Sequence, residues 1–157
     1  MKISDLLQPA AVIVPPKAQG KKQLLQELAA RASQVTRLNE RKIFETLMER
    51  ERLGTTGVGQ GIAIPHGRLA DLKEIVGVFA RLDAPLDYDA VDNQPVDLVF
   101  MLLAPEGAGA DHLKALARVS RLLRNQQVTE KLRAAKSAEA IYAILTDTTS
   151  TSGAQAA

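Results

Sequence analysis

Apolar residues recur at helical spacing in two segments of the first third of the chain. Over residues 21–33, leucines and alanines three or four positions apart form one apolar face, which predicts a helix packed on a core. Asn39 then stands in the position of a helix N-cap, with Leu38 and Ile43 spaced as a hydrophobic staple. Gly54 is well placed to end this second helix.

Continuous apolar runs elsewhere in the chain predict strands. They are short, rich in β-branched or large apolar residues, and bounded by turn signals. The runs are "AAVIV" (10–14), "IAI" (62–64), "EIVGVFARL" (74–82) and "VDLVFMLLA" (96–104). The wholly apolar "IAI" run is expected to be a buried strand.

Helical spacing returns in the last third of the chain. Asp111 is a plausible cap for one helix, and two shorter helices are expected over about 127–135 and 138–146. Helices that alternate with apolar strands predict an α/β fold, in which helices pack on both faces of a small mixed β-sheet. We expect a single domain over residues 1–146 and a disordered tail over 147–157, which has no hydrophobic periodicity.

Composition and charge exclude several classes of function. Twenty Lys and Arg residues against eighteen Asp and Glu give a net charge of only +2. No aromatic residue is interleaved in the densest basic segment, 114–136, so we expect no nucleic-acid partner. The absence of cysteine excludes disulfides and thiolate chemistry. The longest apolar run, "LVFMLLA", is far shorter than the roughly 20 residues of a membrane helix, so we expect a cytoplasmic protein without membrane insertion.

The stretch "GVGQGIAIPHG" (57–67) concentrates glycines beside one of the two histidines of the chain. Its glycine loop follows a predicted helix and enters a predicted strand, which is the reverse of the order in a dinucleotide-binding fingerprint. The histidines have no spacing or acidic neighbours typical of a zinc site, so we expect neither a cofactor nor a metal. Pro65 and Gly67 would break the chain around His66 and present its imidazole at a strand end. There the imidazole would either react or simply terminate the strand.

A longer segment carries a family resemblance. The sequence "ERLGTTGVGQGIAIPHG", from Glu51 to Gly67, resembles the active-site signature of enzyme IIA domains of the bacterial phosphoenolpyruvate-dependent phosphotransferase system, in the fructose–mannitol type class. The likeness extends to "LMERE" before it and "HLKALARVSRLL" after it. Chain length and element order most resemble the stand-alone nitrogen-regulatory branch.

This resemblance implies a phosphotransferase component that carries a covalent phosphohistidine, and not a stand-alone enzyme. His66 would accept a phosphoryl group from a histidine-containing phosphocarrier protein, and the phosphorylation state would regulate partner proteins. A neutral imidazole suits this role because its lone pair is available near neutral pH. The residues do not indicate which imidazole nitrogen carries the phosphate.

The resemblance also implies further site residues. His112 matches a second histidine near the active site of mannitol-type relatives, and Arg50 matches an arginine of the mannitol-type motif. Thr56 is the third candidate, as a hydroxyl ligand of the phosphoryl group. A solvent-facing position at a helix start is the alternative for His112, and a solvated helix face is the alternative for Arg50. Glu51 would repel phosphate, so we expect it to hold its helix or Arg50 in place.

Two other functions are compatible with the sequence. One is a sugar-specific enzyme IIA for fructose or mannitol, which would pass the phosphoryl group to an enzyme IIB. The other is a binding module in which His66 is never phosphorylated. A phosphocarrier must bring its own histidine to bonding distance, so we expect a shallow site with an apolar rim. Val58, Ile62 and Leu69 are candidates for this rim, and each is also a candidate for the core.

Overall fold

A long antiparallel pair of strands forms the centre of the sheet. The computed structural model describes residues 1–147. In it, β5 (Val76–Leu86) pairs with β6 (Val96–Pro105), and Phe79 lies opposite Phe100 with the two rings edge to face, 5.9 Å apart. Residues 98–104 of β6 are all buried. Such a run is typical of a central strand that is covered on both faces.

Short strands flank this pair on both sides. Within residues 1–147 they are β1 (Val12–Ile13), β2 (Gly57–Gly59), β3 (Ile62–Ala63) and β4 (His66–Leu69). Strand β1 runs parallel to β5, β3 and β4 both run parallel to β6, and β2 pairs antiparallel with β3. The sheet order is β1-β5-β6-β3-β2, and β4 pairs with β6 beyond β3. The predicted mixed sheet is therefore confirmed.

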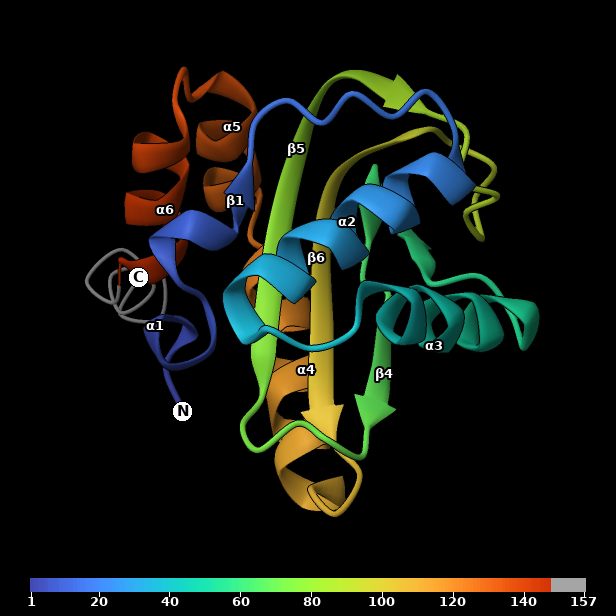
Figure 1. Cartoon of the computed structure of the whole chain (residues 1–157). Coiled ribbons are helices and arrows are strands. Elements are labelled where there is room, and N and C mark those ends of the chain that lie inside the picture. The colour runs from blue at the N-terminus through green and yellow to red at the C-terminus, as the bar shows by residue number, and fades with distance from the viewer. Residues whose placement is uncertain (148–157) are drawn as a thin grey trace.

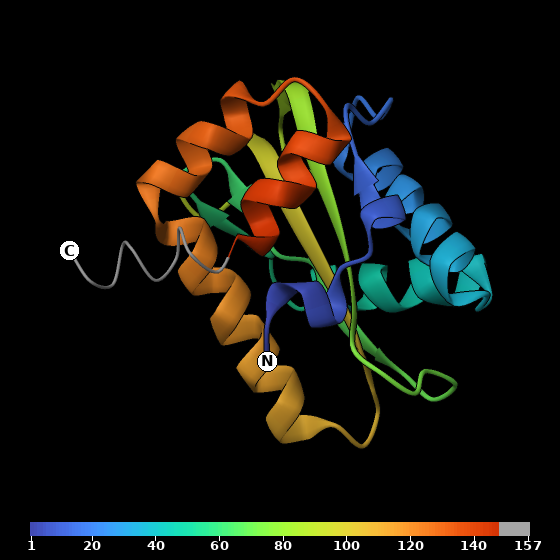
Figure 2. The same cartoon turned by 90° about the vertical axis from the view of Figure 1, so that its left-hand side faces the viewer.

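Helices cover both faces of this sheet, as predicted (Figures 1 and 2). The described residues form α1 (Ile3–Leu6), the 3-10 turn η1 (Pro9–Ala11), α2 (Lys21–Thr36), α3 (Glu40–Arg52), α4 (Gly109–Arg124), α5 (Gln126–Ala134) and α6 (Ala138–Thr146). Helices α2 and α3 lie on one face, and α4, α5 and α6 lie on the other. Among these helices, none is long and apolar enough to span a bilayer.

The predicted helix boundaries are mostly confirmed. Asn39 caps α3, since its side-chain oxygen accepts a hydrogen bond from the Lys42 backbone N–H at 3.0 Å. The prediction that Asp111 caps the next helix is wrong. Helix α4 begins at Gly109, because the Ala108 carbonyl already accepts from the His112 backbone N–H at 2.7 Å. Apart from its first residue, the tail predicted to be disordered lies outside the described residues.

Candidate functional site

Strand β4 begins at His66, directly after Pro65, and continues along the edge of β6. Gly67 extends this strand opposite Leu103. The prediction that Gly67 turns the chain after a strand end is therefore wrong. A Cβ atom at Gly67 would lie 2.5 Å from Cγ2 of Thr46, so a glycine is needed here because α3 packs closely on β4.

The hydrogen bonds of the His66 ring define its tautomer. Nδ1 lies 2.9 Å from the Ile64 carbonyl oxygen, which can only accept, so Nδ1 carries the proton. Nε2 then holds the free lone pair of the neutral ring and accepts a hydrogen bond from Nε of Arg50 at 3.2 Å. Nε2 is therefore the nucleophilic nitrogen of this half-buried imidazole.

The surroundings of His66 keep its ring neutral. Burial lowers the pKa of His66 because the imidazolium form loses solvation, and the nearby Arg50 charge lowers it further. The hydrogen bond to Ile64 and the charge of Glu51 act in the opposite direction without cancelling these effects. The lone pair of Nε2 is therefore present near neutral pH.

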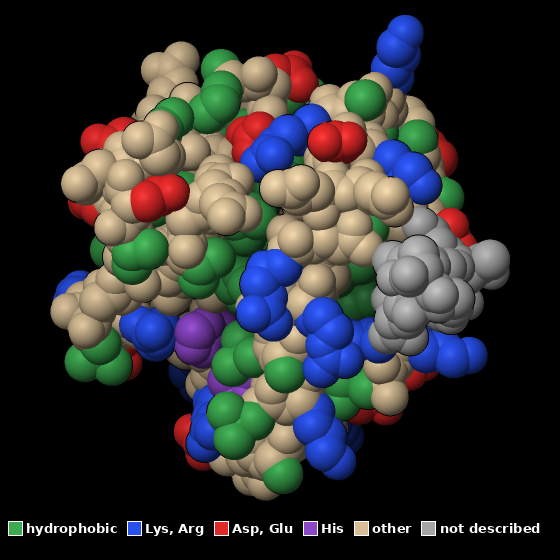
Figure 3. Space-filling model, turned by 180° about the vertical axis from the view of Figure 1, so that it is seen from behind, with side chains coloured by type: hydrophobic (Ala, Val, Ile, Leu, Met, Phe, Trp, Pro, Cys, Tyr) green, Lys and Arg blue, Asp and Glu red, His purple; other side chains and the backbone are tan. Residues whose placement is uncertain are grey.

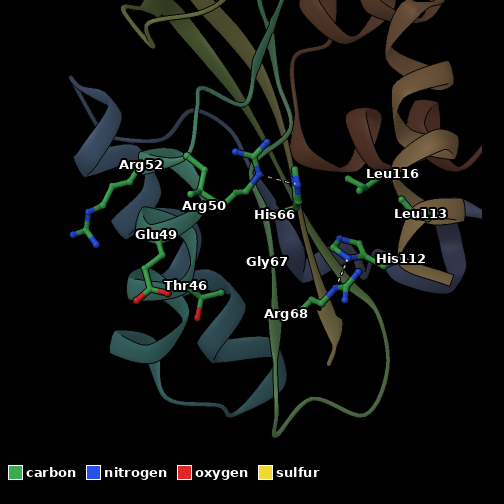
Figure 4. A pocket seen from close by; sticks show the side chains of 11 residues that line it. Thr46, Glu49, Arg50, Arg52, His66, Gly67, Arg68, His112, Leu113 and Leu116 are labelled. Atoms are coloured by element: carbon green, nitrogen blue, oxygen red, sulfur yellow. Dashed lines mark hydrogen bonds between the residues drawn. The ribbon is translucent and has the colours of Figure 1, made fainter. Parts of the chain in front are cut away.

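Arg50 lies in the last turn of α3 and contacts two acceptors. Besides the bond from Nε to His66, its Nη1 donates to the Gly54 carbonyl at 2.8 Å. Arg50 is partly buried and approaches His66 from the α3 side (Figure 4). A solvated position on the helix face, the alternative from the sequence, is therefore not what the structure shows.

His112 approaches the same ring from the other side, on the first turns of α4 (Figure 4). Its ring lies edge to face with that of His66, with centroids 5.6 Å apart. His112 is only 4% exposed, so the alternative of a solvent-facing residue is wrong. Nδ1 accepts from Nε of Arg68 at 3.2 Å, so the proton resides on Nε2, which is buried without a hydrogen-bond partner. Burial and the neighbouring His66 and Arg68 lower the pKa of His112.

Arg68 is the site residue that the sequence analysis missed. It lies two residues after His66 in β4, and residues two apart in a strand project from the same face. This two-residue spacing could have identified Arg68 from the sequence, but a turn expected at Gly67 would have ended the strand before it.

The structure does not bring Thr56 into this group. Thr56 is buried, its hydroxyl donates to the Glu51 carboxylate, and the same hydroxyl lies 2.9 Å from that of Tyr88. It is also absent from the residues that line the pocket beside the histidines. A direct contact between Thr56 and a phosphoryl group stays a prediction.

The two histidines lie in a pocket of about 680 Å³. Its lining residues are Thr46, Glu49, Arg50, Arg52, Leu53, His66, Gly67, Arg68, His112, Leu113 and Leu116. Basic side chains lie near the histidines on this face of the molecule, together with hydrophobic ones (Figure 3). The apolar part of the rim comes from Leu53 and Leu113, which are 85% and 66% exposed. Of the rim candidates from the sequence, Ile62 and Leu69 are core residues and Val58 is exposed outside this pocket.

This arrangement suits a tetrahedral oxyanion next to a nucleophilic nitrogen. Arg50 and Arg68 supply guanidinium donors, and the His112 Nε2–H is a buried donor that lacks an acceptor. Such groups bind and orient phosphoryl oxygens. In the described part of the chain, no group of three or more His, Cys, Asp or Glu residues could hold a metal ion.

Comparison with known proteins identifies the family of this chain. Residues 5–148 match the family model described as "Phosphoenolpyruvate-dependent sugar phosphotransferase system, EIIA 2". A nitrogen regulatory protein of Bradyrhizobium diazoefficiens is 61% identical over 92% of this chain and 95% of its own length.

Two solved structures are also similar. The crystal structure of the nitrogen regulatory protein IIA-Ntr from Neisseria meningitidis has a TM-score of 0.86 and 38% identity, and the match covers 92% of this chain and 99% of that chain. The mannitol IIA protein of Escherichia coli has a TM-score of 0.75 over 88% of this chain and 97% of that one, and at 18% identity it supports the fold alone. On the family match and the relative's identity, the chain belongs to the EIIA 2 family of the phosphoenolpyruvate-dependent sugar phosphotransferase system.

Proposed function

We propose that this chain is a cytoplasmic phosphohistidine carrier of the nitrogen-regulatory branch. His66 accepts a phosphoryl group from a histidine-containing phosphocarrier protein, and the phosphorylation state controls binding to regulatory partner proteins. The family match and the high identity to a nitrogen regulatory protein support this choice among the functions compatible with the sequence.

The single observation that carries the proposal is the orientation of the His66 ring. The Ile64 carbonyl holds the proton on Nδ1, at 2.9 Å, and so directs the lone pair of Nε2 into the pocket lined by donors. A histidine that merely packs would not need a fixed tautomer whose unprotonated nitrogen accepts from a guanidinium group. The site therefore presents one reactive nitrogen in one orientation.

The proposed phosphoryl transfer needs no reactant other than the donor phosphohistidine and His66. The lone pair of Nε2 forms a new P–N bond with the incoming phosphorus, and the P–N bond of the donor phosphohistidine breaks. The electron pair of that bond returns to the donor imidazole, and the His66 Nδ1 proton stays shared with Ile64. Phosphoryl transfer of this kind depends on in-line positioning and on charge stabilisation.

The neighbouring donors supply that stabilisation. When Nε2 forms the P–N bond, it can no longer accept from Arg50, whose Nε–H is then available to the phosphoryl oxygens. The buried His112 Nε2–H gains the acceptor that it lacks in the free protein. Arg68 holds His112 in the tautomer that donates. These groups stay charged or donating while two negative charges arrive.

The test is the mass of the intact protein after incubation with phosphoenolpyruvate, enzyme I and the phosphocarrier protein. We expect the wild type to gain one phosphoryl group that is labile in acid and stable in alkali, and His66→Ala to gain none. No gain in the wild type would favour the non-phosphorylated binding module. An equal gain in His66→Ala would move the phosphorylated residue elsewhere.

A second measurement separates the regulatory role from a sugar-specific one. The phosphorylated protein is mixed with enzyme IIB proteins for fructose and mannitol, and the loss of the phosphoryl group from His66 is followed with time. We expect slow or no transfer. Rapid transfer to either IIB would overturn the regulatory assignment while leaving the phosphocarrier chemistry intact.

A further inference from the structure

A buried polar cluster lies outside the lining of the His66 pocket. We name it the Glu51 cage, and its members are Lys21, Glu51, Thr56 and Tyr88. The Glu51 side chain is only 4% exposed. Its carboxylate accepts from Lys21 Nζ at 2.8 Å, from the Thr56 backbone N–H at 3.2 Å, from the Thr56 hydroxyl, and from the Tyr88 hydroxyl at 3.1 Å. All of its accepting positions are thereby used.

The cage joins three parts of the chain that are distant in sequence, since Thr56 lies only five residues after Glu51. Lys21 begins α2, Glu51 lies in the last turn of α3, and Tyr88 comes from the connection between β5 and β6. The Lys21 ammonium also lies 4.6 Å from the centre of the Tyr88 ring. Burial and the charge of Glu51 raise the pKa of Tyr88, which therefore stays a hydroxyl donor. The Tyr88 segment packs so closely that a Cβ at Gly57 would lie 2.8 Å from that of Ala90.

Two short paths lead from the cage to the reactive nitrogen. In the first, the Glu51 carboxylate holds the Thr56 N–H, the Thr56 carbonyl accepts from the Ile64 N–H at 3.0 Å, and the Ile64 carbonyl accepts from His66 Nδ1. In the second, Glu51 anchors the last turn of α3, where the adjacent Arg50 donates to His66 Nε2. Both nitrogens of the reacting ring are therefore positioned by elements that meet at Glu51.

We propose that the Glu51 cage positions His66 and Arg50 for phosphoryl transfer, with Glu51 and Tyr88 as positioning residues. This inference rests on the proposed phosphocarrier function and extends it to residues that do not touch the phosphoryl group. Burying an ion pair contributes little to stability by itself, because desolvation offsets the attraction. A fixed geometry at the site is what a fully satisfied buried network supplies.

The experiment compares conservative variants of the cage in the full-length chain. Tyr88→Phe removes one donor and keeps the ring, and Glu51→Gln removes the charge and keeps the shape. Asp97→Asn is the matched control. It breaks the Arg133–Asp97 ion pair, which has distances of 2.9 and 3.0 Å and joins α5 to β6 away from the histidines. All four proteins are compared at a temperature where each is folded by circular dichroism.

The readout is the rate of His66 phosphorylation at increasing concentrations of phosphorylated carrier protein. We expect the maximal rate to fall about 10- to 100-fold in Glu51→Gln and less in Tyr88→Phe, as for other small misplacements of reacting groups. The half-saturating carrier concentration should stay close to that of the wild type, because no residue of the cage lines the pocket that holds the histidines. Asp97→Asn should lose stability and keep the wild-type rate.

Nitrogen NMR of the His66 ring gives a second readout that needs no phosphoryl donor. We expect the Nδ1–H tautomer in the wild type and in Asp97→Asn, and a mixture of tautomers in Glu51→Gln and Tyr88→Phe. If Glu51→Gln does not fold, Tyr88→Phe alone decides the outcome. Wild-type rates together with a wild-type tautomer in Tyr88→Phe, or an equal loss of rate in Asp97→Asn, would overturn the proposal. A wild type that takes no phosphate but shows these tautomers would instead refute the phosphocarrier function and leave the cage intact.

Discussion

Replacing Gly67 with alanine should destabilise the contact between α3 and β4. The new Cβ would lie 2.5 Å from Thr46 Cγ2, whereas the next nearest atoms, Cβ and O of Thr46, lie at the ordinary contact distances of 3.7 and 3.8 Å. Rotating the Thr46 side chain away would break the bond from its hydroxyl to the Lys42 carbonyl, at 2.8 Å. The backbones must therefore separate, and overpacking of this kind costs about 1–3 kcal/mol.

A second substitution tests whether that one methyl group is the cause. Thr46→Ser removes Cγ2 and keeps the hydroxyl, so the double variant Gly67→Ala/Thr46→Ser should regain most of the lost stability. Urea denaturation of the four proteins, followed by circular dichroism, measures the coupling between the two sites. The midpoint of thermal unfolding of Gly67→Ala should fall by about 2–4 °C for each kcal/mol lost. Wild-type stability of Gly67→Ala, or a double variant as unstable as Gly67→Ala itself, would refute this reasoning.

Three further predictions follow from the site and its supports. The pKa values of His66 and His112 are lowered in the folded state. As the pH falls, the unfolded chain therefore takes up these two protons at a higher pH than the folded protein does. The free energy of unfolding should consequently fall as the pH drops below about 6.5. Between about pH 7 and 5, the midpoint of thermal unfolding should fall less in His112→Gln than in the wild type. Arg68→Met releases Nδ1 of His112 and should slow His66 phosphorylation about 10- to 100-fold, measured by the rate of label uptake at saturating carrier. Arg81 donates to the Leu132 carbonyl at the end of α5, so Arg81→Met should cost about 1–3 kcal/mol in urea denaturation and leave the phosphorylation rate unchanged.

The elements that the sequence predicted well are those whose signal is local. The strand β6 is a continuous apolar run because both of its faces are covered, and Asn39 caps α3 through a contact three residues away. The histidine-centred signature placed His66, and two of the three other candidates, Arg50 and His112, do meet it in the pocket. Periodicity and short-range capping report these features directly.

The parts that the sequence did not predict depend on contacts between distant segments. Tyr88 lies in a connection without periodicity, and its bond to Glu51 spans 37 residues. Gly67 was interpreted as a turn because glycine permits one, yet it is required by the approach of Thr46 from another element. A single sequence shows that a glycine or a carboxylate is present but not which distant atom it meets. Arg68 was missed for the same reason, because it shares a strand face with His66 only if β4 continues past Gly67.

The charges around His66 are those that the proposed phosphoryl group would require. Arg50 and Arg68 hold two positive charges beside the two histidines, while the side chain of Glu49, the acidic residue of the lining, points away from them (Figure 4). Burial lowers the pKa values of both imidazoles because the imidazolium form loses solvation, and nearby positive charge lowers them further, from Arg50 at His66 and from Arg68 at His112. In the proposed phosphorylated state, a phosphoryl dianion on Nε2 would balance the two guanidinium charges and would give the buried His112 N–H an acceptor. Phosphorylation of His66, as proposed, would therefore supply the negative charge and the acceptor that the free site lacks.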